Sequence, residues 1–259
     1  VLFAALAVVH GLGSGFGQPA SPLGYQKNFV GSIFATVLLL LLAAHREFQL
    51  PRALLRAAGV LLLAGLFATH SRGAMIAAGV GTLIWFFRES GRASGGLRTA
   101  ALAAAIGISI FTAISVNGEL NQGTYSSLTQ RTQVDQATRQ LWKEHPLTGV
   151  GLRFFDTPRY VGYQPPNNFV DEALAEAGVF GLAGFVVFVL GSLVGLARLR
   201  GDLAAAGLCV VAARFSHGLF DIYWTGGTTT VVWIIAGMGL ASASARPAPA
   251  AMSREGTFS

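Results

Sequence analysis

Two arginines in this sequence are well suited to bind a phosphate group. Arg72 lies at residues 69–73, in a short polar segment between two apolar runs, and Arg131 lies near the start of a longer polar stretch. A guanidinium offers five donors in a planar fork that matches phosphate oxygens, and an arginine at a membrane face needs an anionic partner. Each also has a simpler interpretation, as an anchor that extends its charge to the lipid headgroups.

Carboxylates and amides follow the dipeptide Pro165-Pro166. Asn167 or Asn168 is a typical cap for a new helix. Glu172 and Glu176 are four residues apart, so they share one face of that helix. One of the two carboxylates can serve as a general base for a hydroxyl group. The alternative is that these residues only form a well-capped start of the next membrane helix.

A third set of polar residues lies in and after an apolar run near the carboxyl end. Arg214, His217 and Asp221 are three and four residues apart, which places them along one side of a helix. A structural Arg–Asp arrangement with a nearby His is the simpler interpretation, and a substrate contact is the alternative. Lys27 and Asn28, taken alone, are an ordinary helix start. The sequence has no clustered Cys or His and no metal-binding or serine-nucleophile motif, so we predict neither a metal nor a cofactor.

These residues are carried by a strongly apolar chain. Of its 259 residues, 53% are hydrophobic and 12% are charged, whereas soluble domains average about 25% charge. The apolar runs are continuous rather than alternating, which favours helices over a barrel. We therefore predict an all-α, polytopic transmembrane bundle with about eight spans. The predicted runs cover residues 1–12, 29–45, 53–69, 73–88, 98–116, 178–197, 203–219 and 228–245.

The basic residues predict how the chain is oriented. Arginines gather in loops 45–52, 88–98 and 198–202, which fall on one side if the spans alternate, and that side is cytoplasmic by the positive-inside rule. The net charge of +6 is then a matter of topology, and we expect no nucleic-acid partner. The polar stretch at 118–177 faces outward and contains an amphipathic helix at 126–145.

We divide the chain into four parts on this basis. The N-terminal spans occupy residues 1–117, the long outer loop 118–177, the C-terminal spans 178–245, and a disordered cytoplasmic tail 246–259. The sequence opens inside an apolar run without Met, so we expect it to be a piece of a longer membrane protein. A single cysteine, Cys209, allows no internal disulfide.

Several short segments, taken in order, resemble the O-antigen ligase family, which also includes polysaccharide polymerases and related protein oligosaccharyltransferases of bacterial envelopes. The resemblance covers roughly residues 24–240. It is carried by Gln26-Lys27-Asn28-Phe29-Val30-Gly31, by Ser71-Arg72-Gly73, by Arg131 ahead of His145-Pro146-Leu147-Thr148-Gly149-Val150-Gly151, by Asn168, Gly178 and Gly181, and by His217-Gly218-Leu219-Phe220-Asp221.

The resemblance implies a multi-pass protein of the bacterial inner membrane, with the long loop outside. Such a protein takes a glycan from an undecaprenyl-diphosphate carrier and joins it to an acceptor glycan, lipid or protein. Arg72 and Arg131 would contact the diphosphate, and residues 167–181 would border the acceptor. Guanidiniums can stabilise the charge of the leaving diphosphate, so we expect catalysis without a metal. The remaining predicted substrate contacts are Lys27, Asn28, Asn167, Asn168, Arg214, His217 and Asp221.

One departure from the family pattern affects the predicted chemistry. The family motif commonly begins His-Asn, whereas this chain has Asn167-Asn168. Since an amide cannot titrate, we place the general base at Glu172 or Glu176. Two alternatives stay open: a transporter or flippase of lipid-linked sugars, and a non-catalytic membrane assembly factor. A transporter would be expected to carry ionisable residues or broken helices near the middle of the membrane, whereas here the polar residues gather at the outer face.

Overall fold

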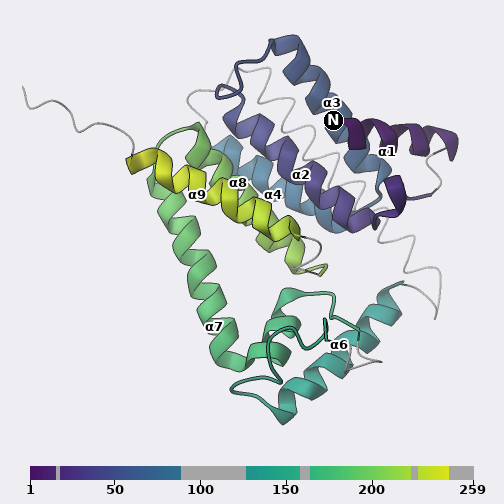
Figure 1. Ribbon diagram of the computed structural model, residues 1–259, viewed down its shortest axis with the longest axis vertical. Helices are drawn as coiled ribbons and strands as arrows, with labels where there is room; N and C mark the ends of the chain where they lie inside the picture. The colour runs from purple at the N-terminus through teal and green to yellow at the C-terminus, as the bar shows by residue number, and fades with distance from the viewer. Residues whose placement is uncertain (16–17, 89–126, 158–163, 223–226, 245–259) are drawn as a thin grey trace, which may run out of the picture.

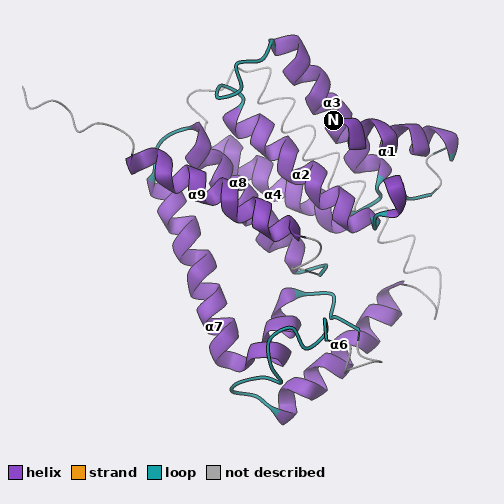
Figure 2. Cartoon of the chain, viewed as in Figure 1, coloured by secondary structure: helices purple, strands orange, loops and turns teal. Residues whose placement is uncertain are grey.

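The computed structural model describes residues 1–15, 18–88, 127–157, 164–222 and 227–244, and over these residues it contains only helices and loops (Figures 1 and 2). The predicted all-α class is therefore confirmed for this part of the chain. The helices are α1 (Leu2–Gly13), η1 (Pro22–Gly24), α2 (Lys27–Ala44), α3 (Arg52–Ala68), α4 (Arg72–Arg88), α6 (Ser127–Glu144), α7 (Phe169–Arg198), α8 (Asp202–Gly218) and α9 (Thr228–Ser244). The predicted span at 98–116 and the tail at 246–259 lie outside the described residues.

Helix α8 is the centre of the bundle. Residues 204–214 are all buried, and the helix packs against α2, α4, α7 and α9. Small residues allow the close approach: a Cβ added to Gly81 of α4 would lie 2.5 Å from the Leu39 side chain and 3.0 Å from the Cys209 carbonyl oxygen. A second apolar cluster joins α1, α2, α3 and α4. Packing of small residues is how helices associate where lipid offers no hydrophobic driving force.

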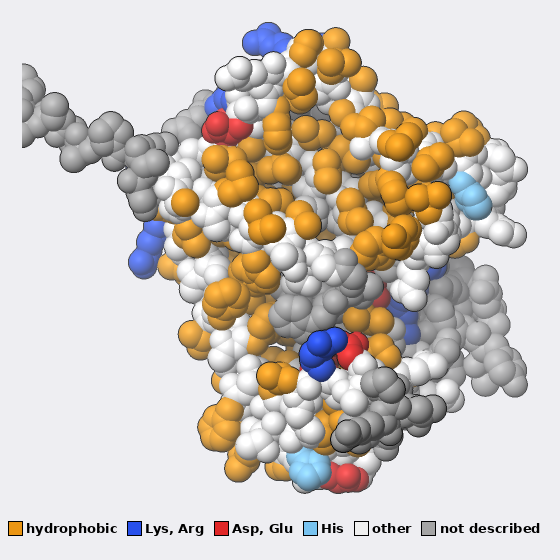
Figure 3. Space-filling view, in the orientation of Figure 1, with side chains coloured by type: hydrophobic (Ala, Val, Ile, Leu, Met, Phe, Trp, Pro, Cys, Tyr) orange, Lys and Arg blue, Asp and Glu red, His pale blue; other side chains and the backbone are white. Residues whose placement is uncertain are grey.

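Two of the described helices, α2 and α7, are long and apolar enough to cross a membrane. The other apolar helices of the described ranges have 17 residues or fewer, so the predicted number of about eight spans is not confirmed. The outer surface of α7 is nonetheless strongly apolar, with Phe180, Val187 and Phe188 all exposed. Figure 3 shows hydrophobic side chains spread over the face of the bundle, with charged ones at its margins and on the lobe beneath it.

This lobe consists of residues 127–157 and 164–177, and is called the polar lobe below. It contains α6, the loop that follows, and the first turns of α7, and it lies to one side of the bundle in Figure 1. The predicted amphipathic helix at 126–145 corresponds to α6. The helix cap predicted at Asn167 or Asn168 is Asn168, because α7 begins at Phe169. The apolar run predicted at 178–197 continues this same helix beyond a kink at Gly178 (φ 66°).

Two glycines hold the loop after α6 against this kink. A Cβ on Gly149 would lie 2.3 Å from the Glu176 carbonyl carbon, and one on Gly178 would lie 2.2 Å from the Leu147 carbonyl carbon. The kink frees backbone groups of α7, and loop groups bond to them. The Val150 and Gly151 N–H groups donate to the carbonyls of residues 175 and 176, at 2.8 and 3.0 Å, and the N–H of residue 179 donates to the Pro146 carbonyl at 3.0 Å. Loop and helix are thus interlocked through their backbones.

Candidate functional site

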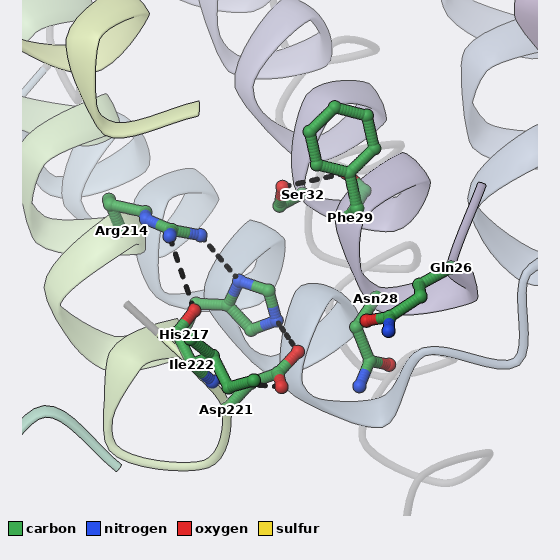
Figure 4. Close-up of a pocket in the computed structure, with 8 residues that line it drawn as sticks. All are labelled: Gln26, Asn28, Phe29, Ser32, Arg214, His217, Asp221 and Ile222. Atoms are coloured by element: carbon green, nitrogen blue, oxygen red, sulfur yellow. Dashed lines mark hydrogen bonds and ion pairs between the residues drawn. The ribbon is translucent and has the colours of Figure 1, made fainter. Parts of the chain in front are cut away.

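A polar pocket lies between the start of α2 and the end of α8. Figure 4 shows side chains at the start of α2 on one side of the pocket and side chains from the end of α8 and the turn after it on the other. The pocket is lined by Gln26, Asn28, Phe29, Ser32, Arg214, His217, Asp221 and Ile222. Four of the predicted substrate contacts, Asn28, Arg214, His217 and Asp221, therefore lie together, although Asn28 is far from the other three in the sequence.

Three of these side chains form a continuous chain of contacts. Arg214 Nη1 lies 3.2 Å from His217 Nδ1, and His217 Nε2 lies 3.5 Å from Asp221 Oδ2. Arg214 also donates from Nη2 to the Ile222 carbonyl at 3.4 Å, which holds the turn after α8 in place. The three- and four-residue spacing does place these groups on one side of the helix end, as the sequence predicted.

Asp221 is the most accessible of the three groups. Its side chain is 13% exposed, against 3% for His217. Burial raises the pKa of the Asp221 carboxyl above its ordinary value, while the Ile222 N–H, the Arg131 and Arg214 guanidiniums and the Asn28 side chain act in the opposite direction. A raised pKa in a polar pocket is typical of a carboxylate that exchanges protons.

The turn before α4 brings Arg72 to the same end of the bundle. His70 takes a left-handed conformation (φ 51°), which reverses the chain within a few residues. Thr69 Oγ1 accepts a hydrogen bond from the Ser71 N–H at 3.2 Å, and Ser71 Oγ accepts one from the Ala74 N–H at 3.4 Å. Ser71 therefore caps α4, whose first residue is Arg72.

Close packing on both sides fixes this turn. A Cβ on Gly31 of α2 would lie 2.8 Å from the Ser71 Cβ, and one on Gly73 would lie 2.7 Å from His217 Cδ2. The half-buried Arg72 thus precedes a residue that packs directly on the imidazole of the pocket. Lys27, also half-buried, is the first residue of α2 and precedes Asn28.

Arg131 connects the polar lobe to the pocket. Its Nη1 donates to the Phe220 carbonyl at 2.7 Å, one residue before Asp221. The two predicted phosphate ligands therefore come from different elements, α4 and α6, and both lie beside the end of α8. Phe169 adds a second connection, because its ring lies 4.8 Å from that of Phe215.

The two asparagines at the start of α7 are held by α6. Asn168 is the helix cap: its Oδ1 accepts from the Asp171 N–H at 2.8 Å, and its Nδ2 donates to Asp171 Oδ2 at 2.9 Å. Arg139 Nε contacts both Asp171 oxygens, at 3.0 and 3.1 Å. The Asn167 N–H donates to Asp135 Oδ1 at 3.2 Å. One face of α6 therefore contacts the turn after α8 and the start of α7, through side chains that are four residues apart: Arg131, Asp135 and Arg139.

The two predicted bases, Glu172 and Glu176, do not line the polar pocket. Glu172 is buried at 7% exposure in the first turn of α7. Glu176 accepts hydrogen bonds from the N–H groups of Arg153, at 3.0 Å, and Phe155, at 3.5 Å, so its carboxylate holds the loop after α6. Among the residues the structure describes, no three His, Cys, Asp or Glu side chains are grouped as metal ligands.

The fold and the site define an all-helical protein whose apolar bundle carries a cationic pocket at one end, next to a polar lobe. Comparison with known families matches residues 57–186 to the O-antigen ligase family, and the chain belongs to that family. Its members are integral membrane proteins. No curated protein matches the chain. The matched segment includes Arg72, Arg131, both asparagines and both glutamates, while the α2 and α8 residues of the pocket lie outside it.

Proposed function

We propose that this protein transfers a glycan from an undecaprenyl-diphosphate carrier to an acceptor glycan, lipid or protein, during assembly of a cell-envelope polysaccharide. The observation that carries the proposal is the position of three arginines at one end of the bundle. Arg214 lines the pocket, Arg131 donates to the Phe220 carbonyl beside it, and Arg72 directly precedes Gly73, which packs on His217. Guanidiniums at the end of an apolar bundle suit the diphosphate of a membrane lipid. Family membership supports the same class of reaction.

The chemistry follows from the charge that develops during transfer. When the bond between the anomeric carbon and the phosphate oxygen breaks, the diphosphate leaves with the electron pair. Positioned guanidiniums stabilise that charge, and Arg72 and Arg131 take this role in the proposal. No metal ion is needed for it. We place the pocket and the polar lobe on the outer side of the bacterial inner membrane, where positive-inside loops leave them.

The acceptor occupies the other side of the site in this proposal. Asn167 and Asn168 border it. Helix α6 holds this segment through Asp135, which accepts from the Asn167 N–H, and through Arg139, which pairs with Asp171, and Phe169 packs on Phe215 of α8. A transporter of lipid-linked sugars fits less well. Transporters place their binding groups near the middle of the membrane, whereas here they gather at the helix ends (Figure 4).

The test is a pair of arginine substitutions in the purified protein, reconstituted with an undecaprenyl-diphosphate-linked oligosaccharide. Arg72→Ala and Arg131→Ala should each abolish transfer, because each lost charge-assisted contact removes about 1.5–3 kcal/mol. Arg→Lys should restore little, since an ammonium cannot bind in a fork. Arg153→Ala, in an exposed ion pair of the polar lobe, is the matched control and should transfer normally. Full transfer by Arg72→Ala at normal expression would refute the phosphate role, and a complete, magnesium-reversible loss of activity in chelator would refute metal independence.

A further inference from the structure

The contacts of His217 determine which of its nitrogens carries the proton. Arginine has five N–H donors and no acceptor, so the Arg214 Nη1 that lies 3.2 Å from His217 Nδ1 must donate to it. Nδ1 is then unprotonated, and the single proton of the neutral ring sits on Nε2. Nε2 lies 3.5 Å from Asp221 Oδ2, a polar contact that is not a hydrogen bond. A second proton on the ring would have to face the Arg214 guanidinium.

Asp221 is consequently the end of a chain of polar contacts that begins at Arg214. Arg214 donates to His217 Nδ1, and the Nε2 side of the ring lies against Asp221, so neither of the first two groups is positioned to accept a proton from a ligand. The other groups around the carboxylate are the Asn28 side chain from α2, the Arg131 guanidinium from α6 and the Ile222 N–H, which donates to Oδ1 at 2.9 Å. All of them are donors or cations. They favour the ionised, proton-accepting form against the effect of burial.

We propose that Asp221 is the proton acceptor of the transfer reaction, and that His217 and Arg214 are positioning residues that orient it. This inference rests on the proposed function. It replaces Glu172 and Glu176 in that role, because Asp221 lines the pocket and they do not. It also accounts for a chain in which Asn167 occupies the position of the family's usual His: the base comes from the end of α8 instead.

The step balances as a single displacement. The acceptor hydroxyl oxygen forms a bond to the anomeric carbon of the donor sugar, and the bond from that carbon to the phosphate oxygen breaks. The electron pair of the broken bond leaves on the diphosphate, beside the arginines. The hydroxyl proton passes to the Asp221 carboxylate, which later releases it to water. No oxidant, metal or further reactant is needed.

The experiment compares Asp221→Asn with His217→Gln in the purified full chain. The donor is an undecaprenyl-diphosphate-linked oligosaccharide, the acceptor is the same oligosaccharide in free form, and turnover is measured as released undecaprenyl diphosphate. Asp221→Asn keeps the size of the side chain and removes the base, so kcat should fall by about 10²–10⁴-fold. Binding of undecaprenyl diphosphate, followed by thermal shift, should change little. Asp221→Glu should recover part of the rate.

His217→Gln is the matched variant, because a glutamine amide can accept from Arg214 and, like the neutral ring, present an N–H group to Asp221. It should keep kcat within about tenfold of wild type, whereas a true histidine base would lose about 10²-fold or more. In the pH profile of wild-type kcat, the rate should fall on the acid side as the Asp221 carboxyl becomes protonated. The residual rate of Asp221→Asn should lack that dependence.

The outcomes separate this inference from the proposed function. Wild-type kcat in Asp221→Asn, or a loss of 10²-fold or more in His217→Gln with undecaprenyl diphosphate still bound, overturns the assignment of Asp221 and leaves the transfer reaction standing. A wild-type protein that neither binds undecaprenyl diphosphate nor releases it from the donor overturns the proposed function itself. Glu172→Gln and Glu176→Gln complete the set of variants. If kcat falls further in either of them than in Asp221→Asn, the base is a glutamate of α7 and the assignment of Asp221 is overturned.

Discussion

The helix bundle and the polar lobe are held together by different kinds of contact. In the bundle, α8 is buried along residues 204–214 and meets its neighbours through Ala, Gly and Val side chains. In the lobe, α6 and α7 are joined by the Arg139–Asp171 ion pair and by the bond from Asn167 to Asp135. The bundle is a packed apolar core, and the lobe is a polar assembly whose geometry depends on individual bonds.

The polar pocket lies where these two regions meet. Arg131 of the lobe donates to the carbonyl of residue 220 at the end of α8, and the Phe169 ring lies against Phe215. Apolar packing places Arg214 and His217 firmly, because α8 has little freedom to move. Directional bonds place Arg131 and the asparagines, and such bonds can be broken one at a time. In the proposed site, the bundle therefore holds most of the donor side, whereas the lobe adds Arg131 to the donor side and holds the acceptor side.

The largest effect is expected at the kink of α7, where the loop after α6 packs against Gly178. Gly178→Ala puts a Cβ within 2.2 Å of the Leu147 carbonyl carbon, at a φ of 66°. Backbone cannot move aside as a side chain can, and left-handed strain adds about 1–2 kcal/mol. We expect the loop after α6 to detach, with faster proteolysis of the lobe and transfer lowered by more than about 100-fold, equivalent to ~2.8 kcal/mol.

Gly184→Ala is the matched control in the same helix. No atom lies within 4 Å of the added Cβ, and this glycine is exposed. Alanine should leave activity unchanged and stabilise the helix by about 0.5–1 kcal/mol. If Gly178→Ala and Gly184→Ala gave the same digestion pattern and rate, the interlocked glycines would have no part in positioning the lobe.

A corresponding change in the bundle should have a smaller effect. Gly31→Ala places a Cβ 2.8 Å from Ser71 Cβ and 3.0 Å from Ala74 Cβ, so α2 and the turn before α4 must separate slightly. Overpacking of this kind costs about 1–3 kcal/mol. Because Asn28 and Arg72 lie on the two separated elements, donor KM should rise by about tenfold, which corresponds to ~1.4 kcal/mol, while proteolysis of the lobe stays normal.

Gly59→Ala is the control for the bundle, because nothing lies within 4 Å of a Cβ added there. It should leave donor KM at the wild-type value. A normal donor KM in Gly31→Ala, or the same rise in both variants, would show that contact between α2 and the α4 turn does not set the donor side.

The bundle was easier to predict from the sequence than the lobe. Helices α2, α3, α4, α8 and α9 begin and end within a few residues of the predicted runs, because continuous apolar segments flanked by polar residues mark their own limits. The predicted cap at Asn167 or Asn168 is confirmed at Asn168, where α7 begins. The kink at Gly178 was not predicted, because the loop that satisfies the kinked backbone lies about 30 residues earlier.

Sequence spacing also predicted part of the site. The three-residue interval placed Arg214 and His217 on one side of α8, since that interval depends only on helix geometry. Asp221 lies beyond the last residue of α8, Gly218, so the turn after the helix brings it to His217. The partners of each group depend on tertiary contacts, which sequence spacing does not reveal. The spacing therefore did not predict that Gln26 and Ser32 line the pocket, or that two loop N–H groups bond to the Glu176 carboxylate.

The smallest effect is expected at Asn167, and it tests the acceptor side alone. Asn167→Ala removes the side-chain amide but keeps the backbone N–H that donates to Asp135 Oδ1. The start of α7 should therefore stay in place, and transfer should lose only one or two hydrogen bonds at about 1 kcal/mol each. This is a rise in acceptor KM of about five- to thirtyfold, with donor KM unchanged.

Asp135→Ala is the contrasting variant, because it removes the acceptor of that backbone bond and releases the segment itself. It should raise acceptor KM more than Asn167→Ala does. Asn167→His restores the residue that is common in the family and should be tolerated, with a rate close to wild type. A large gain in kcat for Asn167→His would mean that a titrating group at this position is the better base, and that Asp221 serves only to orient its neighbours. An unchanged kcat would keep Asp221, at the end of α8, as the proton acceptor. The lobe would then supply Arg131 and position the acceptor, while the bundle would supply Arg72, Arg214 and the base.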